Sequence, residues 1–320
     1  MQTSEKKPRR PVEIRPLVET DLGAADHIMR VAFGTFIGLP DPASFMGDAS
    51  YVPNRWRAHP QAAFAAVVDG KVVGSNLATR WGSVGFFGPL TVVPELWDEG
   101  IGRRLMEPVM ALFDAWRVTH AGLFTFPHSP KHVGFYQTFG FWPGHLTAVM
   151  ARPPWPAENA PWTALSTDDG ERNARIVGCK RVADTQCAGL DLTSEIEATA
   201  KLGFGDTVLL EDDGEVVGFA VCHVGAHTEA GSGACYVKFA AVEPGAGAAR
   251  RFERLLDACA GFASAREAKL LLAGISTARH DAYQLLLARG FRTVLQGVAM
   301  HRPKEAPYSR PDRFVLDDWR

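Results

Sequence analysis

The first half of the chain contains two predicted helices, one that ends near Arg30 and one that begins near Gly102. An alternating run at 12–17 predicts an opening strand, and Thr20 can cap a helix that continues through Arg30. From Gly102 onward apolar residues recur on one helix face, at Leu105, Val109, Leu112, Phe113 and Trp116. Pro108 is awkward inside this helix unless it lies in the first turn.

Between these helices the chain carries paired strands. Apolar runs at 64–68 and 71–79 are joined by an Asp-Gly pair, the strongest short hairpin signal. A second hairpin-like pair, 81–87 and 89–93, leads into a glycine-containing loop. The remaining elements are a strand at 122–126, a helix near 131–138 and a final strand. Antiparallel strands followed by a helical connection predict an α+β fold with a mixed sheet.

The second half of the chain repeats the first. The seven residues from Val68 to Gly74 recur 144 positions later, from Asp212 to Gly218. Further motifs recur at an offset of 150, at 92–94, 104–107, 140–141 and 148–153. A six-residue insertion after the hairpin accounts for the change of offset. A register held over so long a stretch indicates a duplication.

The duplication sets the predicted domain boundaries. We expect a first domain at 12–153 and a second at 164–303, joined by a proline-rich linker at 154–163. The polar, basic residues 1–11 predict a disordered tail, and a C-terminal tail follows at 304–320. Each copy should form a mixed, mostly antiparallel sheet flanked by helices.

Composition constrains partners and location. A chain of 320 residues, 46% hydrophobic and 22% charged, is typical of globular proteins and has room for two cores. The net charge of -2 gives no basic footprint for nucleic acid and no polybasic anchor for a membrane. All five cysteines lie in the second half without a Cys-x-x-Cys pair, which favours free thiols in a reducing cytoplasm over disulfides or a zinc site.

One loop of the first copy has the composition of a phosphate site. Residues 90–105 run from a strand through a loop into a helix. Gly100 and Gly102 allow backbone N–H groups to turn toward one point, and the helix adds the positive end of its dipole. Arg103 or Arg104 can add a charged hydrogen bond. Together these groups can bind a diphosphate, although an ordinary loop explains Gly-x-Gly better when it is taken alone.

These motifs, in this order, resemble the GNAT acetyltransferase superfamily over most of residues 12–153. The family signature is a strand ending in Val-x-Pro, then (Gln/Arg)-x-x-Gly-x-(Gly/Ala) and a helix, with a Tyr and Gly-Phe further on. Residues 92–102 and 135–141 supply the two motifs here. The resemblance implies an N-acetyltransferase that moves an acetyl group from acetyl-CoA to an amine of a small molecule or a peptide.

The resemblance also implies roles for single residues. Backbone groups of Leu90, Thr91 and Val92 would meet the acetyl carbonyl and the pantetheine arm. The pyrophosphate would lie against Asp98, Glu99, Gly100, Ile101, Gly102 and Arg103. Ser129 stands near the pantetheine, where the family often has Asn. Trp97 departs from the family's Gln or Arg, so we expect weaker or altered cofactor binding rather than none.

Acyl transfer to an amine needs an acid and a base. Tyr136 stands at the family's general-acid position and would protonate the coenzyme A thiolate, while a strand N–H near Val92 holds the oxyanion. Packing under the Gly-Phe turn is the other role open to Tyr136. The base is undetermined, because Phe124 stands where some family members have Glu. His128, His132, water and the C-terminal carboxylate all stay open.

The second copy lacks these groups. At the repeat offset, Gly100, Gly102 and Tyr136 become Arg250, Phe252 and Leu286. The glycine-rich residues 245–249 lie too early against the helix, and Tyr283 is about one helical turn off register. We therefore expect a catalytically silent copy that packs against the first.

Two hypotheses of other classes compete with the enzyme. Trp97 and the missing Glu favour a non-catalytic acyl-CoA-binding regulatory protein. A structural pair of degenerate domains is disfavoured because Gly100, Gly102 and Tyr136 are retained together. The sequence does not name the acceptor: the aromatic residues Trp81, Phe86, Phe87 and Trp142 hint at an apolar pocket, but they suit a core equally well.

Overall fold

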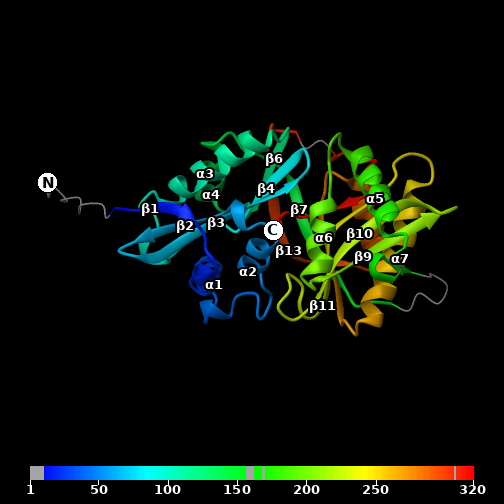
Figure 1. Ribbon diagram of the computed structural model, residues 1–320, viewed down its shortest axis with the longest axis horizontal. Coiled ribbons are helices and arrows are strands. Elements are labelled where there is room, and N and C mark those ends of the chain that lie inside the picture. The colour runs from blue at the N-terminus through cyan, green and yellow to red at the C-terminus, as the bar shows by residue number, and fades with distance from the viewer. Residues whose placement is uncertain (1–10, 156–161, 168–169, 306–307) are drawn as a thin grey trace. The chain divides into compact units, whose positions relative to one another are not determined.

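The computed structural model describes residues 11–155, 162–167, 170–305 and 308–320. Most of the predicted N-terminal tail and of the linker lies outside these residues. The chain divides into two compact units, which are described separately (Figure 1). The first unit takes the described parts of Met1–Gly47, Tyr51–Ala78 and Pro89–Ala115, and the second takes Asp48–Ser50, Thr79–Gly88 and the described parts of Trp116–Arg320.

A small antiparallel sheet forms the first unit. Strands β1 (Glu13–Pro16), β2 (Ala63–Val68) and β3 (Lys71–Trp81) pair in that order, although the last three residues of β3 belong to the second unit. Asp69 and Gly70 adopt φ values of 50° and 76°, which suit the predicted two-residue hairpin turn. The short strand β5 (Thr91–Val92) pairs with β3 through Gly74 and Ser75.

Helix α1 (Leu22–Phe36) begins and ends later than the predicted helix. Thr20 does not cap it, because a 3-10 turn at Glu19–Asp21 comes first. The Asp21 carboxylate holds that turn by accepting from the Arg15 guanidinium at 2.6 Å and from the Val18 N–H at 3.1 Å. The helix then continues past Arg30 because its apolar face stays buried as far as Ala32.

Helix α3 (Ile101–Trp116) keeps Pro108 as its eighth residue, beyond the first turn. The proline ring removes the N–H that would bond to the carbonyl of residue 104. The apolar face compensates for this loss, since Ile101, Leu105, Met106, Val109 and Phe113 are all buried. The predicted helix is confirmed. The first unit also contains α2 (Val52–Ala58) and 3-10 turns at Pro42–Ser44, Pro60–Ala62 and Pro94–Leu96.

The second unit contains one long mixed sheet in the order β4-β6-β13-β7-β12-β11-β10-β9-β8, with β14 paired to β11. Its strands are β4 (Val84–Phe87), β6 (His120–Thr125), β7 (Trp142–Arg152), β8 (Thr163–Ala164), β9 (Gly205–Asp212), β10 (Glu215–Gly225), β11 (Gly231–Val242), β12 (Leu270–Ser276), β13 (Arg292–Arg302) and β14 (Val315–Leu316). Only the β4–β6 and β11–β12 pairings are parallel among the registers described for this sheet, so the predicted fold class is confirmed.

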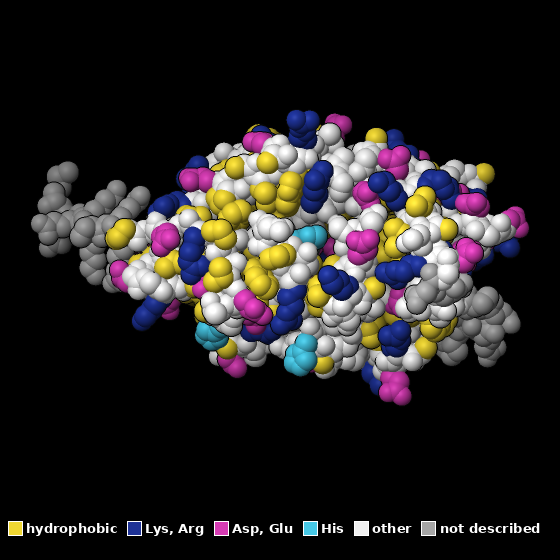
Figure 2. All heavy atoms as spheres, in the orientation of Figure 1, with side chains coloured by type: hydrophobic (Ala, Val, Ile, Leu, Met, Phe, Trp, Pro, Cys, Tyr) yellow, Lys and Arg dark blue, Asp and Glu magenta, His cyan; other side chains and the backbone are white. Residues whose placement is uncertain are grey.

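Five helices flank this sheet: α4 (Pro130–Gln137), α5 (Arg172–Gln186), α6 (Thr193–Lys201), α7 (Ala248–Ala265) and α8 (His280–Ala288), with a 3-10 turn at Leu165–Thr167. None of the helices in the described parts of the chain combines the length and apolarity needed to cross a bilayer. On the face shown in Figure 2, basic and acidic side chains are interspersed.

The second predicted hairpin is wrong. Gly82 adopts φ 61° and ends β3 at Trp81, so β4 covers only Val84–Phe87. Any Cβ at Gly82 would collide with the carbonyl oxygen of Gly189, which explains the need for glycine at this break. Residues Thr91 and Val92 pair with β3 instead of forming the second arm of a hairpin.

The hairpins of the two copies share their details. Asp213 and Gly214 adopt φ values of 51° and 81°, close to those of the first-copy turn. In each hairpin the register skips one valine, Val73 in the first copy and Val217 in the second. These positions are 144 residues apart, the offset seen in the sequence. The same bulge at equivalent positions supports the duplication.

The two copies exchange their last strands. β13, from the second copy, pairs with β6 of the first, and β7, from the first copy, pairs with β12 of the second (Figure 1). The exchange is reciprocal in detail, because Arg302 lies against Gly140 and Arg152 lies against Gly290. β7 and β13 also pair with each other. The division at 153 and 164 stays a prediction, but strands on either side of it share one sheet.

Candidate functional site

The predicted phosphate loop joins β5 to α3 within the first unit. Asp98 and Gly100 adopt φ values of 69° and 80° directly before Ile101, the first residue of α3. A Cβ added to Gly100 would meet nothing within 4 Å, so glycine is favoured there by its backbone angle and not by crowding. The two left-handed residues turn the chain sharply into the helix.

The start of α3 offers hydrogen-bond donors on an exposed turn. The first N–H groups of a helix, here those of Ile101 and Gly102, have no carbonyl one turn earlier in the helix, and they lie at the positive end of its dipole. Asp98, Glu99, Gly100 and Arg103 are all exposed. The turn that leads into the helix is therefore exposed, as the diphosphate hypothesis requires.

Trp97 has a role that the sequence analysis missed. Its indole N–H donates to the main-chain oxygen of Val92 at 2.8 Å, and its own backbone N–H bonds to Pro94 at 3.2 Å. The residue that departs from the family pattern therefore ties the loop to β5. The bond could not be predicted, because nothing in the local sequence marks a tryptophan as a donor to a strand five residues earlier.

Buried polar atoms lie beside β5. Ser75, Asn76 and Thr91 are each at most 4% exposed. The hydroxyls of Ser75 and Thr91 and the amide oxygen of Asn76 have no hydrogen-bond partner among the described residues. The Asn76 amide nitrogen donates to the main-chain oxygen of Leu105 at 3.2 Å. Unpartnered buried polar atoms are costly to the fold, so this cluster beside β5 is an unusual feature of the core.

The remaining candidate residues belong to the second unit. Ser129 is the N-cap of α4, and its hydroxyl accepts from the N–H of His132 at 3.3 Å. Tyr136 is buried on the same helix, with its ring 5.7 Å from that of Phe87. Its carbonyl accepts from Phe141 at 3.2 Å, so it also packs under the Gly-Phe turn. Burial raises the pKa of Tyr136 well above its usual value of 10.

No side chain stands out as the base. His128 is exposed, and the pKa of His132 is lowered by burial and by the neighbouring Lys131 and His128. Phe124 fills space that Gly297 leaves open, because a Cβ on that glycine would collide with its ring. A carboxylate is therefore absent from this position for a packing reason. The sequence left the base open, and the geometry adds no candidate.

Three of the four aromatic residues that hinted at a pocket are core residues. Trp81, Phe86 and Phe87 are at most 2% exposed, while Trp142 is 47% exposed. The Trp81 indole also donates to the buried Glu195 at 3.1 Å. These contacts account for the three buried aromatic residues without any ligand.

In the second copy, core side chains occupy the positions equivalent to the phosphate loop and to Tyr136. Phe252 and Leu286 are fully buried in the core, and Tyr283 packs against the same core. Helix α7 begins after Gly247, whose φ is 82°. The buried Phe252 therefore stands in the first turns of α7 at the position of Gly102, as expected for a copy that lacks the phosphate loop.

Comparisons with known proteins agree with the resemblance of the first copy to GNAT acetyltransferases. Residues 34–141 match the model of the Acetyltransferase (GNAT) family. This match places a GNAT-type acetyltransferase domain within the first copy. No curated protein matches the chain.

Solved structures share the fold over nearly the whole chain. A proposed acetyltransferase from Pyrococcus horikoshii has a TM-score of 0.69 at 14% identity, covering 99% of this chain and 98% of that one. A GCN5-related N-acetyltransferase from Sphaerobacter thermophilus has a TM-score of 0.60 at 17% identity, covering 91% and 95%. A glucosamine N-acetyltransferase region of a fungal multi-domain protein has a TM-score of 0.65 at 11% identity, covering 93% and 39%. At these identities the likeness establishes the fold.

Proposed function

We propose that this protein is a cytoplasmic N-acetyltransferase that moves an acetyl group from acetyl-CoA to an amine of a small molecule or peptide. The observation that carries the proposal is the exposed turn before α3, where Asp98 and Gly100 take left-handed angles and lead directly into the first turn of the helix. The match of the first copy to the GNAT family supports the same activity.

The first unit would bind the coenzyme. Backbone groups of Leu90, Thr91 and Val92 would hold the acetyl carbonyl and the pantetheine arm. The N–H groups of residues 98–103 would hold the pyrophosphate, with the exposed Arg103 adding a positive charge. Trp97 would keep the loop and the strand in register.

The chemistry is a nucleophilic substitution at the thioester. The neutral amine forms a C–N bond, the C–S bond breaks, and the departing thiolate takes a proton from the Tyr136 hydroxyl. Burial raises the pKa of Tyr136, so its hydroxyl keeps its proton throughout the neutral range. A backbone N–H near Val92 would hold the oxyanion. The amine's own proton passes to water, since no side chain is assigned as the base.

A non-catalytic acyl-CoA-binding protein is the second candidate. The specific observation in its favour is Phe124, which packs over Gly297 where some family members carry a glutamate. This candidate retains the coenzyme site and lacks turnover.

Thiol release from acetyl-CoA, measured over a panel of amines, separates the two candidates. The panel should hold polyamines, amino acids, short peptides and glucosamine, the last because a fungal region of the same fold is described as a glucosamine N-acetyltransferase. We expect at least one amine to raise thiol release well above the hydrolysis rate. Saturable binding of coenzyme with no release for any amine would favour the non-catalytic protein.

A further inference from the structure

The C-terminal segment adds a strand to the sheet of the second copy. β14 pairs antiparallel with β11, with Leu316 opposite Ala240 and Val315 opposite Ala241. The N–H of Val242 also bonds to the carbonyl of Phe314 at 3.4 Å. At the repeat offset of 150, residues 240–242 are the equivalents of Leu90, Thr91 and Val92. The segment therefore lies along the positions that would hold the pantetheine arm in the first copy.

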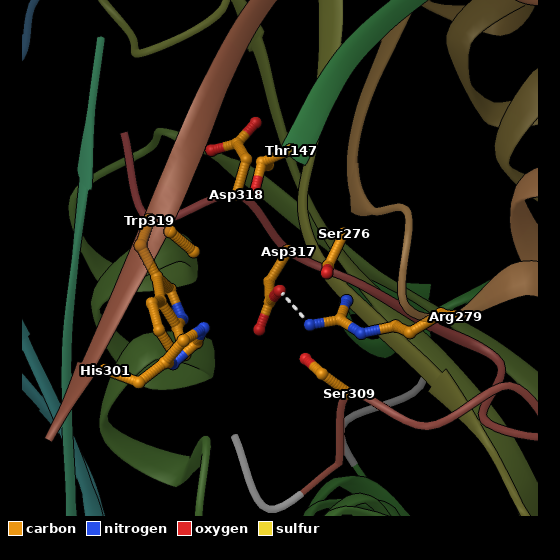
Figure 3. Close-up of a pocket in the computed structure, with 9 residues that line it drawn as sticks. Thr147, Ser276, Arg279, His301, Ser309, Asp317, Asp318 and Trp319 are labelled. Carbon is orange, nitrogen blue, oxygen red and sulfur yellow. Dashed lines mark hydrogen bonds and ion pairs between the residues drawn. The ribbon is translucent and has the colours of Figure 1, made fainter. Parts of the chain in front are cut away.

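Two more equivalents of coenzyme-binding positions contact the same segment. Phe252, the equivalent of Gly102, has its ring 5.5 Å from that of Phe314. Arg279, the equivalent of Ser129, lies at the N-terminus of α8. Its guanidinium donates to the carbonyl of Val315 at 2.8 Å and to the carboxylate of Asp317 at 2.6 Å (Figure 3). Residues 314–317 therefore contact the equivalents of residues 90–92, Gly102 and Ser129.

Hydrogen bonds and close packing hold the rest of the C-terminal segment in place. Tyr236 donates to Asp318 at 2.8 Å, and Tyr308 donates to Asp317 at 2.5 Å. Two strand glycines make room, because a Cβ at Gly274 would collide with the Asp318 side chain and one at Gly122 would collide with the Trp319 ring. Residues 315–319 are each at most 5% exposed. A loosely attached tail would not need such fitted positions.

We propose that residues 314–317 are a built-in occupant of the second copy's coenzyme cleft. The backbone of Val315 and Leu316 pairs with β11 beyond Val237, where the pairing with β12 ends, as the amides of a pantetheine arm would. The Asp317 carboxylate pairs with the Arg279 guanidinium. The proposal rests on the proposed function, which identifies residues 90–92, 102 and 129 as coenzyme positions. Its consequence is one coenzyme site for each chain.

Hydrogen–deuterium exchange on the full chain, with and without coenzyme A, tests this proposal. We expect amides of 240–242 and 314–316 to exchange at least about 100-fold more slowly than unstructured peptide, with no change on adding coenzyme A. Amides of 90–92 and 101–103 should gain protection only with coenzyme A. Fast exchange at 314–316, or protection of 240–242 by coenzyme A, would overturn the occupant.

The two proposals fail in different ways. Suppose that coenzyme A protects neither 90–92 nor 240–242 while the amides of 314–316 still exchange slowly. The coenzyme site of the first copy is then refuted, and the C-terminal segment, although bound to β11, can no longer be said to occupy a coenzyme cleft. A variant sharpens the test: Gly274→Ala should displace Asp318 and speed exchange at 314–316 at least about 10-fold, while protection of 90–92 by coenzyme A persists. Gly23→Ala, at a position with open space, is the control. Equal exchange rates at 314–316 in both variants would contradict the proposal that the packing of Asp318 on Gly274 holds these residues against β11.

Discussion

The indole N–H of Trp97 and the main-chain oxygen of Val92 form a hydrogen bond of 2.8 Å that links the phosphate loop to β5. Trp97→Phe keeps the ring and removes the donor. Because one hydrogen bond contributes about 1 kcal/mol, we expect the dissociation constant of acetyl-CoA to rise roughly 5-fold in calorimetric titration. The exposed Trp142→Phe is the control. Unchanged affinity in Trp97→Phe would show that the loop holds its form without this bond.

Alanine substitutions at Gly100 and Gly70 separate the cost of backbone strain from the loss of acetyl-CoA binding. Their φ values are 80° and 76°, and a Cβ at either position would meet nothing within 4 Å. Alanine at each position should therefore cost a similar free energy of unfolding, about 1 kcal/mol. Only Gly100→Ala should also weaken acetyl-CoA binding, because only that turn is proposed to face the diphosphate. Equal loss of affinity in both variants, or in neither, would refute the role of Gly100.

Tyr136→Phe removes the proposed acid and keeps the packing against Phe87. We expect kcat to fall about 100-fold or more, with the KM for acetyl-CoA nearly unchanged. Tyr283→Phe, at the near-equivalent position of the second copy, should leave kcat unchanged. Because the pKa of Tyr136 is raised, wild-type kcat should show no fall between pH 7 and 9 from loss of this proton. Full turnover in Tyr136→Phe would assign Tyr136 to packing alone.

His120 and His301 make stability depend on pH. Their rings are in contact, with Nε2 and Nδ1 3.1 Å apart, and both are buried. Burial, with His301 nearby, lowers the pKa of His120 to about 3, and Asp317 opposes this effect. Burial, with Arg279 and His145 nearby, lowers the pKa of His301 to about 4.

The sign of the effect follows from proton uptake. Below pH 6.5 the unfolded histidines bind protons and the folded ones do not, so the free energy of unfolding should fall as pH decreases, down to about pH 3. At pH 5 the loss is about 2 kcal/mol for each histidine. Urea denaturation at pH 7 and pH 5 measures it, and His120→Phe/His301→Leu should flatten the change. The exposed His27→Gln is the control. A wild type that is equally stable at both values would contradict these shifted pKa values.

A double-mutant cycle tests the seat of Trp319 on Gly122. Gly122→Ala should cost about 1–3 kcal/mol of unfolding free energy, because the added methyl group collides with the indole ring. Trp319→Ala should cost about 3–5 kcal/mol through lost burial. The double variant should cost clearly less than both together, since the collision is gone. Strict additivity would mean that the two residues do not touch.

Local pattern predicted the elements better than their partners. The hairpin at β2 and β3, the helix α3 and the strand β6 all follow from spacing and turn chemistry. The exchange of β7 and β13 does not, because both strands carry the same repeat pattern and either could pair with β6 or β12. Choice of partner depends on packing across the whole sheet, which periodicity along one strand does not encode.

The candidate site could also be predicted from the sequence only in part. The glycines and the helix start could be found from the sequence, because left-handed angles and helix termini have residue preferences. The bond from Trp97 to Val92 and the seat of residues 314–319 could not, since each depends on a tertiary contact. The C-terminal residues 304–320 looked like a tail because nothing in their composition signals that β11 offers them an edge.

Calorimetric titration of the full chain with acetyl-CoA tests the central claim most directly. We predict saturable binding at one site per chain, weakened by Gly100→Ala and unaffected by Gly70→Ala. Absence of binding heat together with absence of any thermal stabilisation by acetyl-CoA would contradict the claim that the turn before α3 holds the coenzyme.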